Sequence, residues 1–175
     1  MKAATINEIK QELNVIAPAK LLDLCIRLAK YKKDNKELLN YLLFEAHDES
    51  AYIENVKAEI DEQFIAINLS NLHFVKKSLR KILRTTAKYI RYTGSKQAEV
   101  ELLLYFCSRL VSSAIPFHKS TALVNLYQSQ LKKIGKVIAT LHEDLQYDYL
   151  KELKKLGEPE VKLGGNFIQL FLKKK

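Results

Sequence analysis

Glycine and proline are scarce in this 175-residue sequence, which has five glycines, three prolines and no tryptophan. So few turn-forming residues argue against a sheet-rich fold, whose tight turns need them, and also against disorder. The abundant Leu, Ile, Lys, Glu and Ala favour helices. A chain of this length suits one core. We therefore expect an all-α fold, with a single helical domain at residues 1–157 and a C-terminal arm at residues 158–175.

Cysteines and long apolar runs are also rare. Cys25 and Cys107 both lie in apolar stretches, which predicts two reduced core thiols rather than a disulfide. Charged residues are spread through residues 1–16, which leaves no apolar core of a signal peptide, so we expect no secretory signal. No apolar run approaches the roughly 18 residues that span a bilayer. These observations predict a cytoplasmic protein that does not bind membranes.

Capping signals mark the first helices. Thr5 and Glu8 have the spacing of a capping box, which predicts a short helix that runs to about Asn14. Pro18 suits the first turn of a second helix, where its missing N–H has no cost. One buried stripe is expected on that second helix, because apolar residues recur at helical spacing: Leu21, Leu24, Cys25, Leu28 and Ala29.

The later helices follow from the same signals. Gly94 suits the end of a long fifth helix, and Pro116 interrupts the chain after a strongly apolar sixth one. We expect about seven helices in antiparallel αα-hairpins, as a bundle or a short HEAT-like stack. In the arm, Gly164-Gly165 predicts either a small β-hairpin or an irregular, extended segment. The remaining expected helix starts are Asp34, Asp48, Ser70, Ser95, Ser120 or Thr121, and about Asp144, the last either separate or continuous with its predecessor.

The most informative segment lies between His73 and Tyr92, where every charged residue is basic. At about 100° per residue, the seven basic residues project within an arc of roughly 140°. Apolar residues occupy the opposite side. The pattern predicts an amphipathic helix whose basic face can neutralise phosphates, with Tyr92 at its edge to stack on a base. This candidate binding face consists of Lys76, Lys77, Arg80, Lys81, Arg84, Lys88 and Arg91.

An acidic stretch precedes the basic one, and it supports other interpretations. Residues 45–62 contain seven acidic residues and one lysine, so the two stretches could form a hairpin whose flanks pair. A plain solvated face, an acidic protein partner and a membrane surface are further alternatives. The membrane is the least favoured, because the apolar side is needed for the core. A phosphate-binding face needs free basic side chains, whereas a structural one pairs them with Glu54, Glu59 and Glu62.

Motifs for catalysis are absent from the sequence. We find no glycine-rich phosphate loop, no Gly-x-Ser-x-Gly elbow and no kinase signature. The four histidines lack metal-ligand spacing, so no metal or cofactor site is expected. The leading prediction is a non-enzymatic protein-interaction or scaffold domain with a protein partner, for which an acidic protein is one candidate. The alternative is nonspecific nucleic-acid binding through the basic face of helix 71–93. The oligomeric state is open.

Two stretches, LAKYKKDNKELLNYLLFEAHDE and KKSLRKILR…EVELLLYFC, resemble small all-α hypothetical proteins of bacteria that carry no assigned function. The resemblance implies an all-α fold and supplies no site residue.

Overall fold

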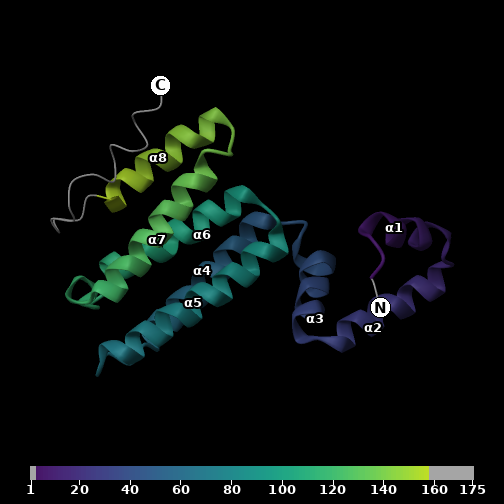
Figure 1. The fold of residues 1–175 in the computed structure, drawn as a ribbon, viewed down its shortest axis with the longest axis horizontal. Coiled ribbons are helices and arrows are strands. Elements are labelled where there is room, and N and C mark those ends of the chain that lie inside the picture. The colour runs from purple at the N-terminus through teal and green to yellow at the C-terminus, as the bar shows by residue number, and fades with distance from the viewer. Residues whose placement is uncertain (1–2, 158–175) are drawn as a thin grey trace. The chain divides into compact units, whose positions relative to one another are not determined.

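A computed structural model of the chain describes residues 3–157 (Figure 1). Every regular element of this part is a helix, which confirms the all-α prediction, and the predicted arm at residues 158–175 lies outside it. The last helix is separate from its predecessor. The π-helix Tyr41–Glu45 follows α3, and the 3₁₀ helix Phe117–Lys119 precedes α7. The α-helices are α1 (Ile6–Val15), α2 (Pro18–Tyr31), α3 (Lys33–Asn40), α4 (Glu49–Ile65), α5 (Leu72–Thr93), α6 (Lys96–Ser112), α7 (Thr121–Ile138) and α8 (Glu143–Gly157).

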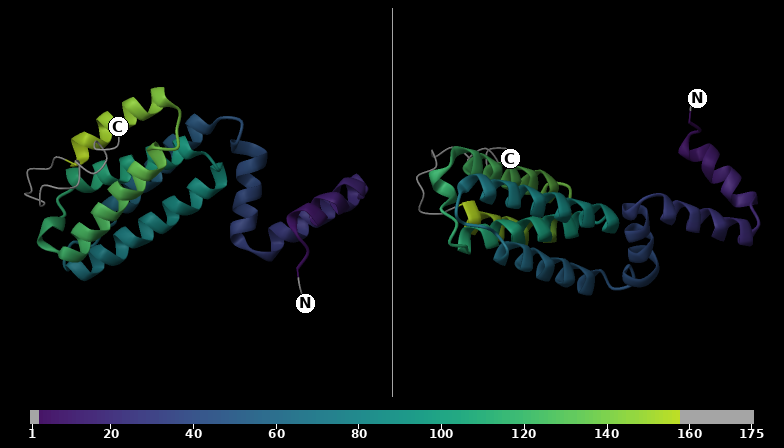
Figure 2. Two further views of the ribbon diagram at one scale, coloured as in Figure 1. Left: turned by 45° about the horizontal axis from the view of Figure 1, so that its top comes forward. Right: turned by 90° about the horizontal axis from the view of Figure 1, so that it is seen from below.

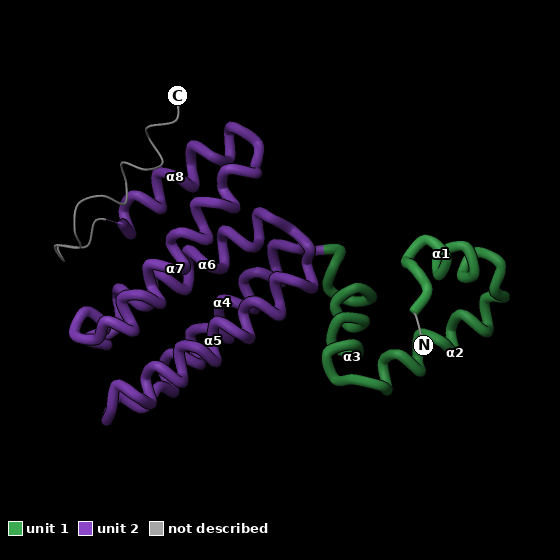
Figure 3. Tube along the Cα trace, in the orientation of Figure 1, with its two compact units in different colours: residues 1–47 green, residues 48–175 purple. Residues whose placement is uncertain are grey.

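The chain divides into two compact units, residues 1–47 and residues 48–175 (Figure 3). We call them the N-terminal unit and the bundle unit. The prediction of one helical domain over residues 1–157 stays a prediction, since compact units of this kind can belong to one domain or to two.

The bundle unit is organised around α6, which packs against α4, α5, α7 and α8 (Figure 2). Burial on most sides, expected from its apolar sequence, is confirmed. Phe106 of α6 packs against Phe64 of α4, with ring centroids 5.5 Å apart. Beyond α6, Phe117 packs against Tyr127 of α7 at 5.3 Å. The buried residues of α6 are Ala98, Glu99, Val100, Leu102, Leu103, Leu104, Phe106, Cys107 and Leu110.

Several helix ends lie where their capping residues predict them. The Thr5 backbone N–H donates to Glu8 Oε2 at 2.6 Å, and the Glu8 N–H donates to Thr5 Oγ1 at 3.3 Å, which completes the capping box. Pro18 occupies the first turn of α2. Gly94 ends α5 with φ of 64°, in the left-handed region that glycine adopts without strain.

Two predicted helix starts are wrong by a residue or two. Asn71 caps α5 in place of Ser70, because its side-chain oxygen accepts the His73 N–H at 2.8 Å. Helix α3 begins at Lys33, so Asp34 lies inside its first turn and is no cap.

The N-terminal unit has little interior. Among residues 3–47 only Tyr41 is buried, so the expected buried stripe of α2 is wrong. Helix α2 packs against α3, and Asn35 Nδ2 fixes their corner by donating to the Leu28 carbonyl oxygen at 2.9 Å. Cys25, on the α3 side of α2, is half-buried there rather than enclosed.

Candidate nucleic-acid interface

Helix α5 buries one side and exposes the other. Its buried residues lie toward α4 and α6, and the Thr86 hydroxyl among them donates to the Ile82 carbonyl oxygen at 3.0 Å. That bond satisfies the one polar group on the apolar side. The periodicity of the sequence therefore assigned the two sides of this helix correctly. The buried set is Val75, Leu79, Ile82, Thr86 and Ile90.

The basic side chains of α5 occupy the exposed side, except that Lys76 and Lys88 are half-buried. Lys77, Arg80, Arg84 and Arg91 project within an arc of about 60°, directly opposite the buried residues. With Lys88 they form a row of about one cation per turn, roughly 5.4 Å apart and about 21 Å long. We call these five residues the α5 cationic row.

Most of the basic residues make no polar contact in the described part of the chain. Lys88 differs, because its Nζ lies 4.9 Å from the ring centre of Tyr89 and 6.0 Å from that of Tyr92. The cation of Lys88 is therefore partly engaged by aromatic faces. The basic residues whose side chains make no ion pair or hydrogen bond within residues 3–157 are Lys76, Lys77, Arg80, Lys81, Arg84 and Arg91.

The acidic residues expected to pair with this face have other partners or none. Glu54 pairs with Lys57 of its own helix at 2.7 Å. Glu59 accepts the Tyr89 hydroxyl at 2.7 Å and the Gln63 amide at 3.0 Å. The side chain of Glu62 makes no hydrogen bond or ion pair within the part of the chain that is described. Within residues 3–157, the α4–α5 hairpin thus leaves Lys77, Arg80, Arg84 and Arg91 without an ion pair.

Two residues of α4, Lys57 and Asp61, form ion pairs with α6, which the sequence did not predict. We call these contacts and the Tyr105 hydrogen bond beside them the α4–α6 seam. Lys57 Nζ donates to Glu101 Oε1 at 2.6 Å. Asp61 Oδ2 accepts the Tyr105 hydroxyl at 2.7 Å, and its Oδ1 lies 2.6 Å from Arg109 Nε. The Arg109 N–H does not point along that line, so this contact is an ion pair rather than a directed hydrogen bond.

The pKa values of the seam follow from burial and these contacts. Burial lowers the pKa of Lys57, but the hydrogen bonds to Glu101 and Glu54 outweigh it and raise the pKa overall. Burial and the Asp61 contact both raise the pKa of Tyr105. Both groups therefore keep their protons at neutral pH, which fixes the lysine as a cation and the phenol as a donor.

A groove of about 550 Å³ lies between α4 and α5, beside the cationic row. Glu59 and Glu62 line its α4 wall, and Lys81 and Thr85 line its α5 wall. Because two carboxylates lie on the side of Lys81, that lysine is the least suited of the seven to hold a phosphate.

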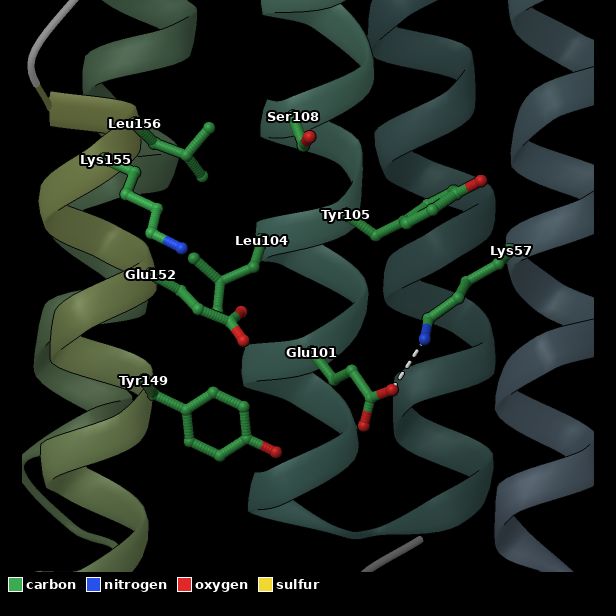
Figure 4. Close-up of a pocket in the computed structure, with 9 residues that line it drawn as sticks. All are labelled: Lys57, Glu101, Leu104, Tyr105, Ser108, Tyr149, Glu152, Lys155 and Leu156. Atoms are coloured by element: carbon green, nitrogen blue, oxygen red, sulfur yellow. Dashed lines mark hydrogen bonds and ion pairs between the residues drawn. The ribbon is translucent and has the colours of Figure 1, made fainter.

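A pocket of about 480 Å³ opens between α4, α6 and α8 (Figure 4). Side chains of α8, among them Tyr149, Glu152 and Lys155, point toward α6 there. Burial raises the pKa of Tyr149, and the nearby carboxylates add to this effect. Two lysines and two glutamates line the pocket, so it has no net charge that would attract a charged substrate.

Residues 3–157 contain neither a cluster of metal ligands nor a membrane-spanning helix. No group of three or more His, Cys, Asp or Glu side chains there could hold a metal ion. Across the same residues, no helix is long and apolar enough to cross a membrane. Cys107 is buried and unpaired, as the sequence predicts, and burial raises the pKa of its thiol.

Comparison with known proteins found no matching family model, no similar curated protein and no similar solved structure. We therefore infer the function from the geometry of the residues themselves.

Proposed function

We propose that this protein is a non-enzymatic, sequence-nonspecific nucleic-acid-binding protein that engages phosphates through the α5 cationic row. The observation that carries the proposal is the outward row itself, in which Lys77, Arg80, Arg84 and Arg91 have no partner within the described residues. Helix α5 contains no acidic residue, and the chain has a net charge of +9. The cytoplasmic location predicted from the sequence would give it access to nucleic acid.

The spacing of the row supports binding to a phosphate backbone. Phosphates of one DNA strand follow each other every 3.4 Å along the helix axis, so cations about 5.4 Å apart can each lie near a phosphate of an extended strand. The side chains of Arg and Lys are long and flexible, so they can reach phosphates whose spacing differs from that of the cations. Nothing in the row distinguishes one base from another, which is why the proposal specifies sequence-nonspecific binding. Tyr92, half-buried beside Lys88, offers one aromatic edge next to the row.

Fluorescence anisotropy tests the proposal with labelled single- and double-stranded DNA and RNA, titrated with protein at several salt concentrations. We expect micromolar binding whose log–log dependence on salt has a slope of about −3 to −5, since three to five phosphates are engaged. The variant Arg80→Glu/Arg84→Glu/Arg91→Glu should abolish this binding. It should keep its helical circular dichroism, because the three side chains project outward.

A control variant separates the row from net charge. Lys136→Glu/Lys151→Glu/Lys154→Glu changes the charge by the same amount at exposed residues of α7 and α8. Equal weakening by both triple variants would mean that net charge alone attracts the nucleic acid, against the proposal. Absence of binding at low salt would reject it outright and favour an acidic protein partner for α5.

A protein-interaction role is the second candidate, and the N-terminal unit favours it. Ile6 is 82% exposed, Leu22 63% and Leu43 63%, within a unit that encloses one buried residue among residues 3–47. Several large apolar side chains exposed within one small unit favour a role in association. We therefore propose that this unit, rather than α5, is the protein-binding surface of the chain.

A further inference from the structure

Helix α1 has an apolar stripe that nothing in the described chain buries. Ile6, Ile9 and Leu13 follow each other at spacings of three and four residues, so they lie on one side of the helix. Their exposed fractions are 82%, 43% and 39%, and α1 contains no buried residue. A helix of ten residues is marginal in water without a packed face. The stripe therefore needs a partner.

Helix α2 offers a second uncovered stripe. Leu22 and Ile26 are one turn apart and are 63% and 44% exposed, to one side of the residues that contact α3. The charged residues of α2 lie on the opposite side, so the apolar arc is wide enough for α3 and for another helix. The stripe of α2 is thus complementary in chemistry to that of α1.

We propose that the partner is a second copy of this chain, and that α1 of each copy packs on the Leu22–Ile26 stripe of the other. In a two-fold symmetric dimer this contact forms twice, so the α1 stripe and the α2 stripe of both copies are covered. The inference rests on the protein-interaction role of the N-terminal unit and is independent of nucleic-acid binding by α5.

Charge favours a second copy over a lipid surface or an acidic partner. Residues 3–47 contain seven basic and six acidic residues, so two such units meet without strong repulsion. The same balance gives the unit little attraction for an anionic membrane, whose binding depends on an excess of Lys and Arg. The excess positive charge of the chain lies in the bundle unit, on α5 in particular.

The uncovered area of the two stripes fits a weak dimer. A fully exposed aliphatic side chain offers about 60–120 Å² of apolar area. Weighted by their exposed fractions, the five stripe residues therefore offer on the order of 250 Å² per copy. Two copies would bury about 500 Å² of apolar area, and homodimer interfaces are about 65% apolar. The whole interface would therefore be about 800 Å², which is the size of weak or transient complexes.

Sedimentation velocity of the full chain, at about 1–100 µM, tests the inference. We expect a species of twice the 20.2 kDa chain mass. The variants Ile9→Asp/Leu13→Asp and Leu22→Asp/Ile26→Asp should each weaken dimerisation about 100-fold or more, because each would bury carboxylates. Val15→Asp is the matched control: Val15 is 80% exposed on the opposite side of α1, so this variant should stay dimeric.

A second measurement shows that the variants are folded. Nucleic-acid binding by α5 depends on the bundle unit alone, so the anisotropy titration should be unchanged apart from any avidity of the dimer. Where that titration detects no binding in the wild type, the thermal unfolding of the bundle unit serves the same purpose. A monomer with an unchanged bundle unit identifies lost association rather than lost folding.

The other outcomes reject the dimer in distinguishable ways. A wild-type dimer that tolerates both double variants would associate elsewhere. A wild-type monomer that binds an apolar dye, with the dye lost in the double variants, would overturn the dimer but keep a protein-binding surface. A monomer that does not bind the dye would overturn both. A monomer that sediments with phosphatidylserine-containing vesicles would show that the stripes face lipid.

Discussion

Substitution of Tyr127 by Phe tests how the end of α8 is held on the bundle. The Tyr127 ring is 0% exposed, and its hydroxyl donates to the Leu156 carbonyl oxygen at 2.6 Å. Burial raises the pKa of this phenol, so it remains a donor throughout the working pH range. Phenylalanine keeps the ring and its contact with Phe117, and removes the donor alone. The change therefore isolates a single hydrogen bond.

The expected cost follows from the burial of the two partners. An acceptor that loses its donor in a buried site costs about 1–3 kcal/mol. Leu156 is half-buried, so water can partly replace the lost donor, and we expect about 1–2 kcal/mol. A chain of this size loses about 2–4 °C in Tm for each kcal/mol, which predicts a decrease of about 2–8 °C.

Urea unfolding followed by far-ultraviolet circular dichroism measures the difference, with Tyr147→Phe as the control. Tyr147 lies on α8, the helix that carries Leu156; it is 75% exposed, and its hydroxyl makes no hydrogen bond within residues 3–157. Removal of its hydroxyl should change the free energy of unfolding by less than about 0.5 kcal/mol. Equal effects of the two substitutions would refute the assignment of stabilising energy to the Tyr127 bond.

Two further predictions concern α6. Leu103→Ala should cost about 2–5 kcal/mol, because a fully enclosed leucine leaves a cavity, and unchanged thermal unfolding would contradict the central position of this helix. Burial raises the pKa of Glu99, but Lys133 and Lys96 outweigh it, so the pKa falls below the usual 4.5. Ionised Glu99 therefore stabilises the fold above pH 4.5, and this is lost as pH falls through the lower folded-state pKa. Unfolding free energies measured from pH 7 to 2 should fall less steeply for Glu99→Gln, and parallel curves would contradict this.

Local signals in the sequence predicted much of the helical structure. The capping box at Thr5, the proline at the start of α2 and the glycine after α5 each act within a few residues, so their geometry can be inferred without tertiary information. The error at Ser70 has the same origin. Ser70 and Asn71 are adjacent and both suit an N-cap, and the choice between them depends on where the preceding loop ends.

The partners of the charged residues could not be predicted, because they depend on which helices lie on either side of α4. Lys57 and Asp61 project toward one flank of that helix and Glu59 toward the other. When acidic residues are counted along the sequence, those on the two flanks of the helix are grouped together. The structure separates them, since α6 lies beside the first flank and α5 beside the second. The absence of ion pairs at Lys77, Arg80, Arg84 and Arg91 within the described residues is a consequence of that packing.

The exposure of the N-terminal unit has a different cause. Apolar residues at helical spacing indicate that a side of the helix needs covering, and they do not indicate which surface covers it. For α5 and α6 the covering surface is in the same unit. For α1 it is absent from the described residues of the chain, and α3 covers only part of the apolar side of α2. For α2, a correct periodicity therefore led to a wrong expectation of burial.

The unequal burial of the two cysteines makes the chain a ready subject for site-selective chemistry. A thiol reacts through its thiolate, and burial denies Cys107 both that ionised form and access to a reagent. Cys25 is half-exposed in the N-terminal unit, near the Leu22–Ile26 stripe. A maleimide fluorophore added to the native protein would attach at Cys25 alone, and so report on the N-terminal unit without any engineered residue. Modification of Cys107 would follow only when the bundle unit opens. The rate of that modification would therefore report the rate at which the bundle unit unfolds.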